Sequence, residues 1–286
     1  MNQPLTPELA QWLVAQRHAG HNDEAILRAM LQSGWTESSA RVALSRTLVL
    51  LKDPVPAVPA AAAAGAYTPG LPEPKIDSGA TSVWAGDREV QILTVMASPR
   101  VIVFGNLLSA EECAGLREAA APRLSRSETV KVDTGGSEVN ESRTSQGMFF
   151  MRGENDVCKR FEARVAALLN WPLDHGEGLQ ILRYGPGAEY RPHYDYFDPN
   201  HSGTQAILKR GGQRVGTLVT YLNTPTCGGA TTFPDVGLEV QAIQGNAVFF
   251  SYDRPEPSTR TLHGGAPVLK GEKWVATKWL RQGHFE

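Results

Sequence analysis

Residues 179–196 read LQILRYGPGAEYRPHYDY, and this stretch decides the fold class. Two short runs rich in apolar and aromatic residues, 179–184 and 189–196, flank a Gly-Pro-Gly turn, which is the pattern of β-strands joined by a loop. Three further runs of the same kind follow, at 214–222, 247–252 and 273–281. A series of short strands with turn residues between them predicts a sheet-based barrel or jelly roll.

Two helices are expected before the strand series. Ser109 is followed three residues later by Glu112, and this capping box predicts a helix that runs to about Ala121. Apolar residues at helical spacing predict a second helix near 155–170. Because both helices precede the strands, we expect them to buttress the sheets from one side. The fold class is therefore mainly β with supporting α.

The N-terminal part has a different character. Residues 1–52 predict a module of three short helices with polar capping residues before each. Residues 53–75 contain six prolines and seven alanines, a composition that predicts a semi-extended linker. The main domain then covers 76–286. The helical module could recruit a protein partner, or it could be a packing or dimerisation appendage.

Composition excludes some classes of partner and compartment. The chain has 28 basic and 30 acidic residues and a net charge of −2, so nothing in its overall charge favours nucleic acid or an anionic membrane. Cys113, Cys158 and Cys227 lie far apart with no CxxC spacing, which argues against a disulfide framework or a structural zinc site. The N-terminus lacks the pattern of a signal peptide, and we expect a cytoplasmic protein.

Candidate metal ligands lie in the deciding stretch. His193 and Asp195 are two residues apart in a predicted strand, so both side chains point to the same face and can approach one metal ion. A third ligand must come from elsewhere. Candidates among the seven histidines are limited, and His263 lies in a Gly-rich turn just before the final strands. Two imidazoles and one carboxylate form the facial triad of non-haem Fe(II) oxygenases, which leaves coordination sites for a cosubstrate and dioxygen.

Lys273 begins the last predicted strand and shares a face with Val275, Thr277 and Trp279. If that face lines the barrel, the lysine requires a buried anion as its partner. A dicarboxylate cosubstrate would supply one. The alternative is a solvated lysine on the edge of the sheet.

Residues from about 98 to 282 resemble the catalytic domain of prolyl 4-hydroxylases, in the Fe(II)- and 2-oxoglutarate-dependent dioxygenase superfamily. The order and spacing of several motifs carry the resemblance. They are Ser109-Ala-Glu-Glu-Cys113, Arg143-Thr-Ser145, residues 184–195, residues 214–222, Gly228-Gly229 to Pro234, and His263 to Trp279. The resemblance implies a double-stranded β-helix, that is, a jelly roll with helices packed outside it.

The resemblance also implies site residues. His193, Asp195 and His263 would bind Fe(II), and Lys273 would pair with the distal carboxylate of 2-oxoglutarate. Lesser roles fall to five other residues: Tyr184 and Thr231 as further contacts to 2-oxoglutarate, and Tyr190, Arg214 and Trp279 as the lining of a peptide groove. One departure is Ala230, which replaces the glutamate of the family's Gly-Gly-Glu-Thr turn.

The implied reaction is hydroxylation of a prolyl residue in a peptide or protein, with release of succinate and CO2. Fe(II), 2-oxoglutarate and O2 would take part, and L-ascorbate (vitamin C) is expected as a further cofactor. Two alternatives are open. The same chemistry could act on a free amino acid or another small molecule, or the protein could be a non-catalytic binding protein. The second is disfavoured because all four key positions, the three ligands and the lysine, are filled.

Overall fold

The computed structural model describes residues 22–33, 35–37, 40, 44, 70–126, 128–130, 137–139 and 144–286. The chain divides into two units, Met1–Ala63 and Ala64–Glu286. In the described ranges no helix is long and apolar enough to cross a membrane.

In the first unit the second predicted helix is present as α2 (Asp23–Gln32). Asn22 caps it, because its side chain accepts a hydrogen bond from the backbone N–H of Ala25. Ile26 and Met30 on its buried face form a small apolar cluster with Ala40 and Leu44. The predicted first helix and most of the predicted third lie outside the described residues.

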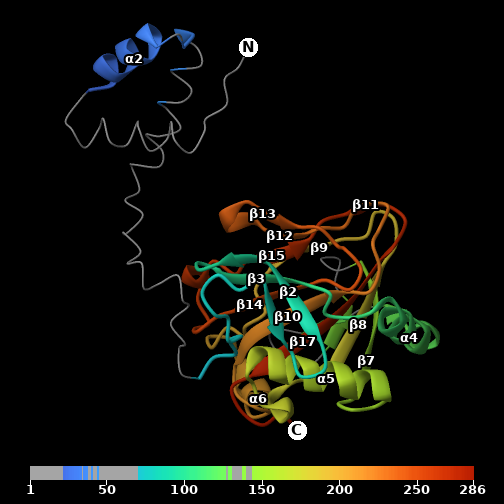
Figure 1. Ribbon diagram of the computed structural model, residues 1–286. Helices are drawn as coiled ribbons and strands as arrows, with labels where there is room; N and C mark the ends of the chain where they lie inside the picture. Colours follow the sequence, from blue (N-terminus) through green and yellow to red (C-terminus); the bar gives the residue numbers. More distant parts are fainter. Residues whose placement is uncertain are drawn as a thin grey trace. The chain divides into compact units, whose positions relative to one another are not determined.

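The second unit is built on a sheet of nine strands, which we call the large sheet (Figure 1). Two of its central strands are buried along their whole length, as expected for strands covered on both faces. In spatial order the strands are β1 (Ser82–Trp84), β2 (Glu89–Met96), β3 (Arg100–Gly105), β14 (Ala247–Ser251), β10 (Arg214–Tyr221), β17 (Lys273–Arg281), β8 (Leu179–Tyr184), β7 (Gln146–Phe150) and β4 (Ser125–Arg126).

A second sheet of four antiparallel strands, the small sheet, covers one face of the large sheet (Figure 1). Its order is β13 (Leu238–Val240), β12 (Thr231–Phe233), β15 (His263–Gly265) and β9 (Tyr190–His193). Two strand pairs lie apart from both sheets: β11 (Cys227–Gly228) with β16 (Val268–Lys270), and β5 (Glu128–Val130) with β6 (Ser137–Val139).

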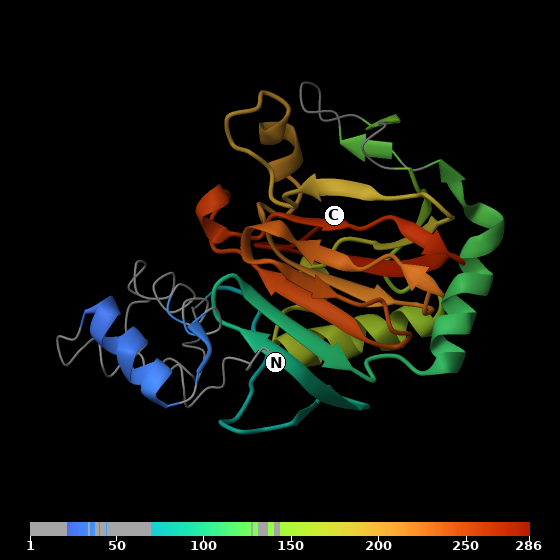
Figure 2. The ribbon, with the colours of Figure 1, turned by 90° about the horizontal axis from the view of Figure 1, so that it is seen from above.

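Helices cover the opposite face of the large sheet. Figure 1 shows α5 on the side away from the small sheet, and Figure 2 shows α4 along one flank of the strands. Ser109 and Glu112 form the predicted capping box at the start of α4. The helical segments are α4 (Ala110–Ala120), α5 (Asp156–Leu169) and α6 (Thr204–Leu208), with short 3-10 turns η2 (Ala121–Arg123), η3 (Leu173–His175), η4 (Pro234–Val236) and η5 (Pro257–Thr259).

Two apolar cores follow from this layering. One lies between the helices and the large sheet, where Phe161 of α5 and Phe249 of β14 are fully buried. The other lies between the two sheets and includes Phe233 of β12 and Phe250 of β14, whose rings meet edge to face at 5.3 Å between centroids. The successive residues Phe249 and Phe250 thus pack in different cores, because neighbouring side chains of a strand point to opposite faces.

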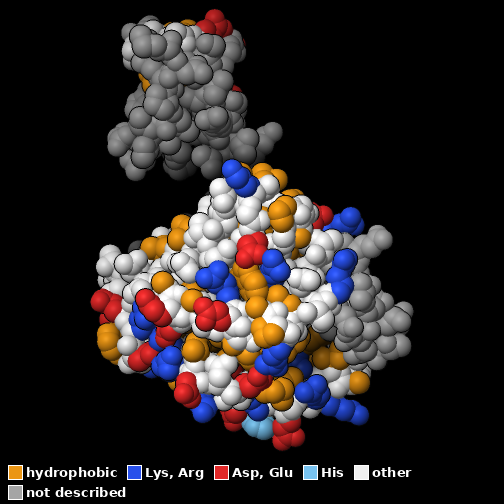
Figure 3. All heavy atoms as spheres, turned by 90° about the vertical axis from the view of Figure 1, so that its right-hand side faces the viewer, with side chains coloured by type: hydrophobic (Ala, Val, Ile, Leu, Met, Phe, Trp, Pro, Cys, Tyr) orange, Lys and Arg blue, Asp and Glu red, His pale blue; other side chains and the backbone are white. Residues whose placement is uncertain are grey.

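The second unit is mostly β-strand with few helices, which is compatible with the expected jelly roll. Residues 70–75, the end of the predicted linker, lie within this unit. There Pro72 and Pro74 are buried and Glu73 forms an ion pair with Arg100. On the surface shown in Figure 3, acidic and basic side chains are interspersed, in keeping with the nearly balanced charge.

Candidate active site

The small sheet brings the two predicted histidine ligands together. His263 of β15 is the direct cross-strand partner of His193 of β9, and their ring centroids lie 4.4 Å apart. Asp195 follows two residues after His193, with its Oδ1 atom 3.5 Å from Nε2 of His193 and its Oδ2 atom 3.4 Å from Nε2 of His263. One ligand atom from each of the three residues lies within 4.8 Å of the others.

Backbone hydrogen bonds fix which nitrogen of each imidazole is available. Nδ1 of His193 lies 2.9 Å from the carbonyl oxygen of Arg191, and Nδ1 of His263 lies 3.0 Å from that of Thr261. A carbonyl oxygen can only accept, so each Nδ1 must carry a proton. In the neutral rings Nε2 is then unprotonated, and both Nε2 atoms face Asp195. This arrangement orients an imidazole as a metal ligand.

The charges of the cluster also suit a cation. Burial and the neighbouring His263 lower the pKa of His193, which favours its neutral form. Burial acts to raise the pKa of Asp195, but His263 and His193 hold it well below its usual range, so this carboxylate is ionised. Two imidazoles and one carboxylate are the donor set of a non-haem Fe(II) centre, and the residues present fit that metal.

A pocket opens over this cluster between the two sheets. Together with the open solvent at its mouth it encloses about 440 Å³ of space. Eight of the nine predicted site residues line it, and Arg214 is the exception. The lining includes His193, Asp195 and His263 from the cluster, together with Lys273, Tyr184, Thr231, Tyr190 and Trp279.

Lys273 lies inside this pocket with 4% of its surface exposed. Its Nζ atom lies 5.5 Å from the ring centroid of Tyr184, its partner on β8, and 5.8 Å from that of Tyr221. Within the described ranges no carboxylate lies at ion-pair distance from the ammonium. Burial therefore lowers the pKa of Lys273 to about 8. The interpretation as a solvated edge lysine is wrong, and the pocket offers a buried cation to an anionic ligand.

Thr231 of the lining and Gly229 of the turn before β12 lie at the same end of the pocket. Thr231 is buried and accepts a hydrogen bond from the hydroxyl of Tyr221 at 2.8 Å. The turn before β12 comes close to the lysine, because a Cβ atom on Gly229 would lie 3.2 Å from Cδ of Lys273. Gly229 also has a φ of +75°, so the turn requires glycine on both counts.

At the other side of the pocket lie aromatic rings. Tyr190 stacks on His193 with 3.7 Å between ring centroids. Trp279 lines the pocket, and the guanidinium carbon of Arg214 lies 3.9 Å from the centroid of one of its rings. Arg214 itself is held by two hydrogen bonds to Glu177, at 2.7 and 2.9 Å. The structure therefore places Arg214 behind Trp279, where it supports the ring.

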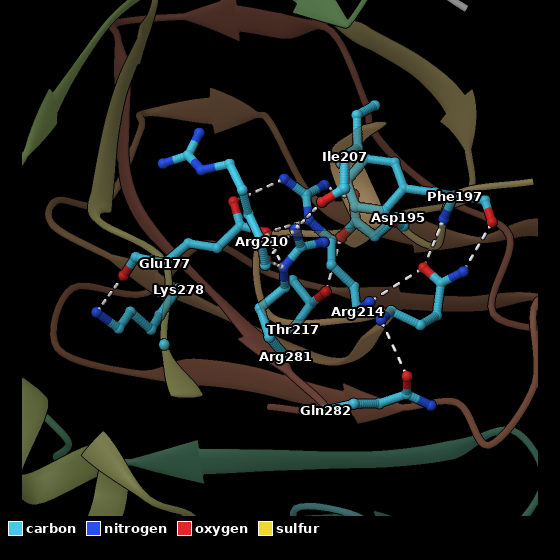
Figure 4. A network of polar contacts seen from close by, with 12 residues as sticks. Glu177, Asp195, Phe197, Ile207, Arg210, Arg214, Thr217, Lys278, Arg281 and Gln282 are labelled. Atoms are coloured by element: carbon cyan, nitrogen blue, oxygen red, sulfur yellow. Dashed lines mark hydrogen bonds and ion pairs between the residues drawn. The ribbon is translucent and has the colours of Figure 1, made fainter. Parts of the chain in front are cut away.

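Figure 4 shows the polar network behind the site. One nitrogen of Arg214 contacts the carbonyl oxygen of Asp195 at 3.3 Å, and Arg281 lies 3.5 Å from the carboxylate of Glu177. Lys278 donates to the carbonyl oxygen of Glu177 and, at 2.5 Å, to Glu162 of α5. These contacts link a metal-ligand candidate to the last strand and to a helix on the far side of the sheet.

Sequence reasoning missed two polar residues that lie directly behind Asp195. Thr217 of β10 donates a hydrogen bond to Oδ2 of Asp195 at 2.8 Å, and its hydroxyl lies 3.0 Å from that of Tyr252. One signal was available. Thr217 lies on the same face of its strand as Val215, Val219 and Tyr221. A polar residue on a face that points into the protein needs a hydrogen-bond partner.

Comparison with known proteins gives the family. Residues 179–281 match the 2OG-Fe(II) oxygenase superfamily. Two relatives from Arabidopsis thaliana are similar over most of their length. Prolyl 4-hydroxylase 1 is 39% identical over 227 residues, covering 70% of this chain and 78% of the relative, and probable prolyl 4-hydroxylase 3 is 37% identical over 222 residues, covering 70% and 75%.

Among solved structures, the viral collagen prolyl hydroxylase of Paramecium Bursaria Chlorella virus-1, in its 2OG complex, is 29% identical. The match covers 63% of this chain and 95% of that one, with a TM-score of 0.49. The identity of the plant relatives, over three quarters of their length, decides the matter. The chain belongs to the prolyl 4-hydroxylase family of the 2OG-Fe(II) oxygenase superfamily and is a 2-oxoglutarate-dependent dioxygenase.

Proposed function

We propose that this protein hydroxylates a prolyl residue of a peptide or protein substrate, using Fe(II), 2-oxoglutarate and O2 and releasing succinate and CO2. The observation that carries the proposal is one pocket in which His193, Asp195 and His263 converge beside the buried ammonium of Lys273, which has no acidic partner among the residues that the structure describes. The relatives named prolyl 4-hydroxylase support the choice of a prolyl substrate. The finer fold assignment, a double-stranded β-helix, is part of the same proposal.

The roles within the site follow from charge and position. Nε2 of both histidines and a carboxylate oxygen of Asp195 would hold Fe(II). When bound, this metal supplies the redox chemistry of a non-haem oxygenase, with positions left for other ligands. Lys273 would bind the distal carboxylate of 2-oxoglutarate, since an anion there removes the cost of burying an unpaired ammonium. Tyr184 and Thr231 lie beside it and would orient the same molecule.

The aromatic side of the pocket would receive the substrate. Tyr190 and Trp279 present ring surfaces next to the ligand cluster, and a proline ring packs well against such surfaces. Arg214, bound to Glu177 and stacked on Trp279, would act on the substrate by holding the tryptophan ring in place. These side chains hold the target carbon near the metal, and orientation of this kind contributes much of the rate acceleration in enzymes.

The experiment that tests the proposal uses the iron-loaded protein, 2-oxoglutarate and a library of proline-containing peptides. Mass spectrometry should find products that have gained one oxygen atom on proline. A parallel incubation with free amino acids tests the small-molecule alternative. If oxygen is gained only by a free amino acid, the prolyl-peptide assignment is wrong although the dioxygenase chemistry stands.

Three further features belong to the proposal. L-Ascorbate would sustain turnover, which a progress curve with and without it tests. A cytoplasmic location agrees with three free thiols, Cys113, Cys158 and Cys227. The N-terminal helical module would recruit a protein partner or target, and a pull-down with residues 1–69 as bait, followed by a direct binding assay, tests this role.

A further inference from the structure

The carboxylate of Asp195 has a further polar neighbour besides the two histidines. Its Oδ2 atom receives the hydrogen bond from Thr217, and Thr217 in turn lies 3.0 Å from the hydroxyl of Tyr252. The three residues come from different parts of the chain. Thr217 lies in β10, and Tyr252 follows β14, the neighbouring strand, whose Phe250 is the cross-strand partner of Thr217.

The direction of both hydrogen bonds, the one between Thr217 and Asp195 and the one between Tyr252 and Thr217, follows from which groups carry a proton. The Thr217 hydroxyl donates to Oδ2 of Asp195 at 2.8 Å, since a carboxylate that binds a metal can only accept. That hydroxyl has one proton, and it can therefore only accept from Tyr252. The phenol must in turn be neutral, which agrees with its burial: 3% of Tyr252 and none of Thr217 is exposed. Protons thus point from Tyr252 through Thr217 to Asp195.

We infer that Thr217 and Tyr252 are positioning residues that hold Asp195 as a one-oxygen metal ligand, an inference that rests on the proposed function. The hydrogen bond engages Oδ2 and weakens it as a donor to a metal. Oδ1 lies 3.5 Å from Nε2 of His193 and accepts no such bond from a described residue, so it is left as the stronger ligand atom, while Oδ2, 3.4 Å from Nε2 of His263, stays bound to Thr217. A carboxylate that binds through one oxygen leaves more coordination positions for the cosubstrate and dioxygen than one that binds through two. Partners of ligands commonly fix geometry in this way.

Burial makes this series of hydrogen bonds, from Tyr252 through Thr217 to Asp195, rigid. No water is needed to complete it, and rotation of the Asp195 carboxylate would leave the buried hydroxyl of Thr217 without an acceptor, which carries a free-energy cost. Phe250 and Tyr196 pack around the phenol, with ring centroids 6.3 and 6.1 Å from that of Tyr252. Packing therefore holds the Tyr252 end of this series of hydrogen bonds, and the carboxylate of Asp195 holds the other end.

The test measures metal binding without turnover, with Co(II) as the probe. Thr217→Val keeps the shape of the side chain and removes the donor, and we expect the Kd for Co(II) to rise roughly 10- to 100-fold. The visible spectrum of the bound Co(II) should change, since the coordination geometry changes. Thr217→Ser restores the donor and should return both readouts to those of the wild type. Tyr252→Phe leaves the hydrogen bond from Thr217 to Asp195 in place. It should raise the Kd and change the spectrum as Thr217→Val does, but by less.

Thr220 provides a matched control. It lies on the same strand, is fully buried, and its hydroxyl finds no hydrogen-bond partner among the described residues. Thr220→Val should leave the Kd and the spectrum unchanged. If Thr217→Val behaves as Thr220→Val does, the inference is overturned. Should Thr217→Val fail to fold, Tyr252→Phe carries the test, and an unchanged spectrum there is equally contradictory. Failure of the wild type to bind Co(II) would instead refute the proposed function.

Discussion

His193 and His263 are direct cross-strand partners in the small sheet, although 70 positions separate them in the sequence. Each directs Nε2 toward Asp195 because each Nδ1 is tied to a backbone carbonyl two residues earlier. Strand pairing therefore sets the distance between the two imidazoles, and local backbone bonds set their orientation. Such a site is largely formed before any metal arrives, which reduces the reorganisation that metal binding requires.

Asp195→Ala should abolish specific iron binding. Removal of the carboxylate takes away the only acidic ligand of the cluster, and loss of a direct ligand should exceed the roughly 10- to 100-fold loss typical of outer-shell changes. Equilibrium dialysis with Fe(II) under anaerobic conditions measures the effect. Asp198→Ala, at a half-exposed carboxylate three residues away, is the control and should bind iron like the wild type. Full iron occupancy in Asp195→Ala would refute the triad.

Lys273→Met should raise the Kd for 2-oxoglutarate while leaving iron affinity nearly unchanged. Loss of a buried charge partner costs ~2–5 kcal/mol, which corresponds to roughly 30- to 5,000-fold in affinity. Titration of the iron-loaded protein with 2-oxoglutarate gives the value. Lys270→Met, at an exposed lysine of β16, serves as the control. An unchanged Kd in Lys273→Met would show that the distal carboxylate binds elsewhere.

The buried lysine also predicts how stability depends on pH. The folded pKa of Lys273 is about 8, below the ordinary 10.5, so between these values the unfolded chain binds a proton that the folded chain has lost. Stability relative to Lys273→Met should therefore rise as pH increases from about 8 to about 10.5, by up to about 3 kcal/mol. Urea unfolding across this range measures the difference. Saturating 2-oxoglutarate should flatten the slope, and a flat difference without ligand would contradict the burial of an unpaired ammonium.

Deletion of residues 1–69 should leave a folded, active core on short peptides, because the site residues all lie in the second unit. A protein that lacks residues 1–75 should be less stable than one that lacks 1–69, since it also loses Pro72 and Glu73, and with Glu73 the ion pair to Arg100. Thermal unfolding and peptide turnover compare the two. If the module recruits a target, the shorter deletion should lose activity mainly on the full-length target. Loss of peptide turnover in that deletion would show that the module is part of the catalytic fold.

Much of the strand series could be predicted from sequence. The strands 179–184 and 273–281 have the predicted bounds, and the capping box at Ser109 starts α4 as expected. Local pattern decides these elements. The segment 82–105 was not assigned, although it supplies three strands: β3 is buried on both faces, and β2 shows no clean alternation, so neither has the period-2 signal of a half-buried strand.

The candidate site also contains residues that could be predicted from the sequence and residues that could not. His193 and Asp195 could be recognised together because they are two residues apart on one strand. His263 and Lys273 were candidates from their local sequence, and the resemblance gave them their roles. Thr217 and Tyr252 could not be paired, because only the long-range pairing of β10 with β14 brings them together. Arg214 illustrates the same limit, since its ion pair with Glu177, two residues before β8, places it behind Trp279.

Succinate and hydroxyproline, measured together in one reaction, test prolyl hydroxylation by this protein. The iron-loaded wild type is incubated with 2-oxoglutarate, O2 and a proline-containing peptide, and both products are quantified over time. We predict that hydroxyproline forms only with 2-oxoglutarate present, in amounts equal to the succinate above a peptide-free blank, and that Asp195→Ala forms neither. Succinate that does not rise when any proline-containing peptide is added, with all prolines unmodified, would contradict the assignment.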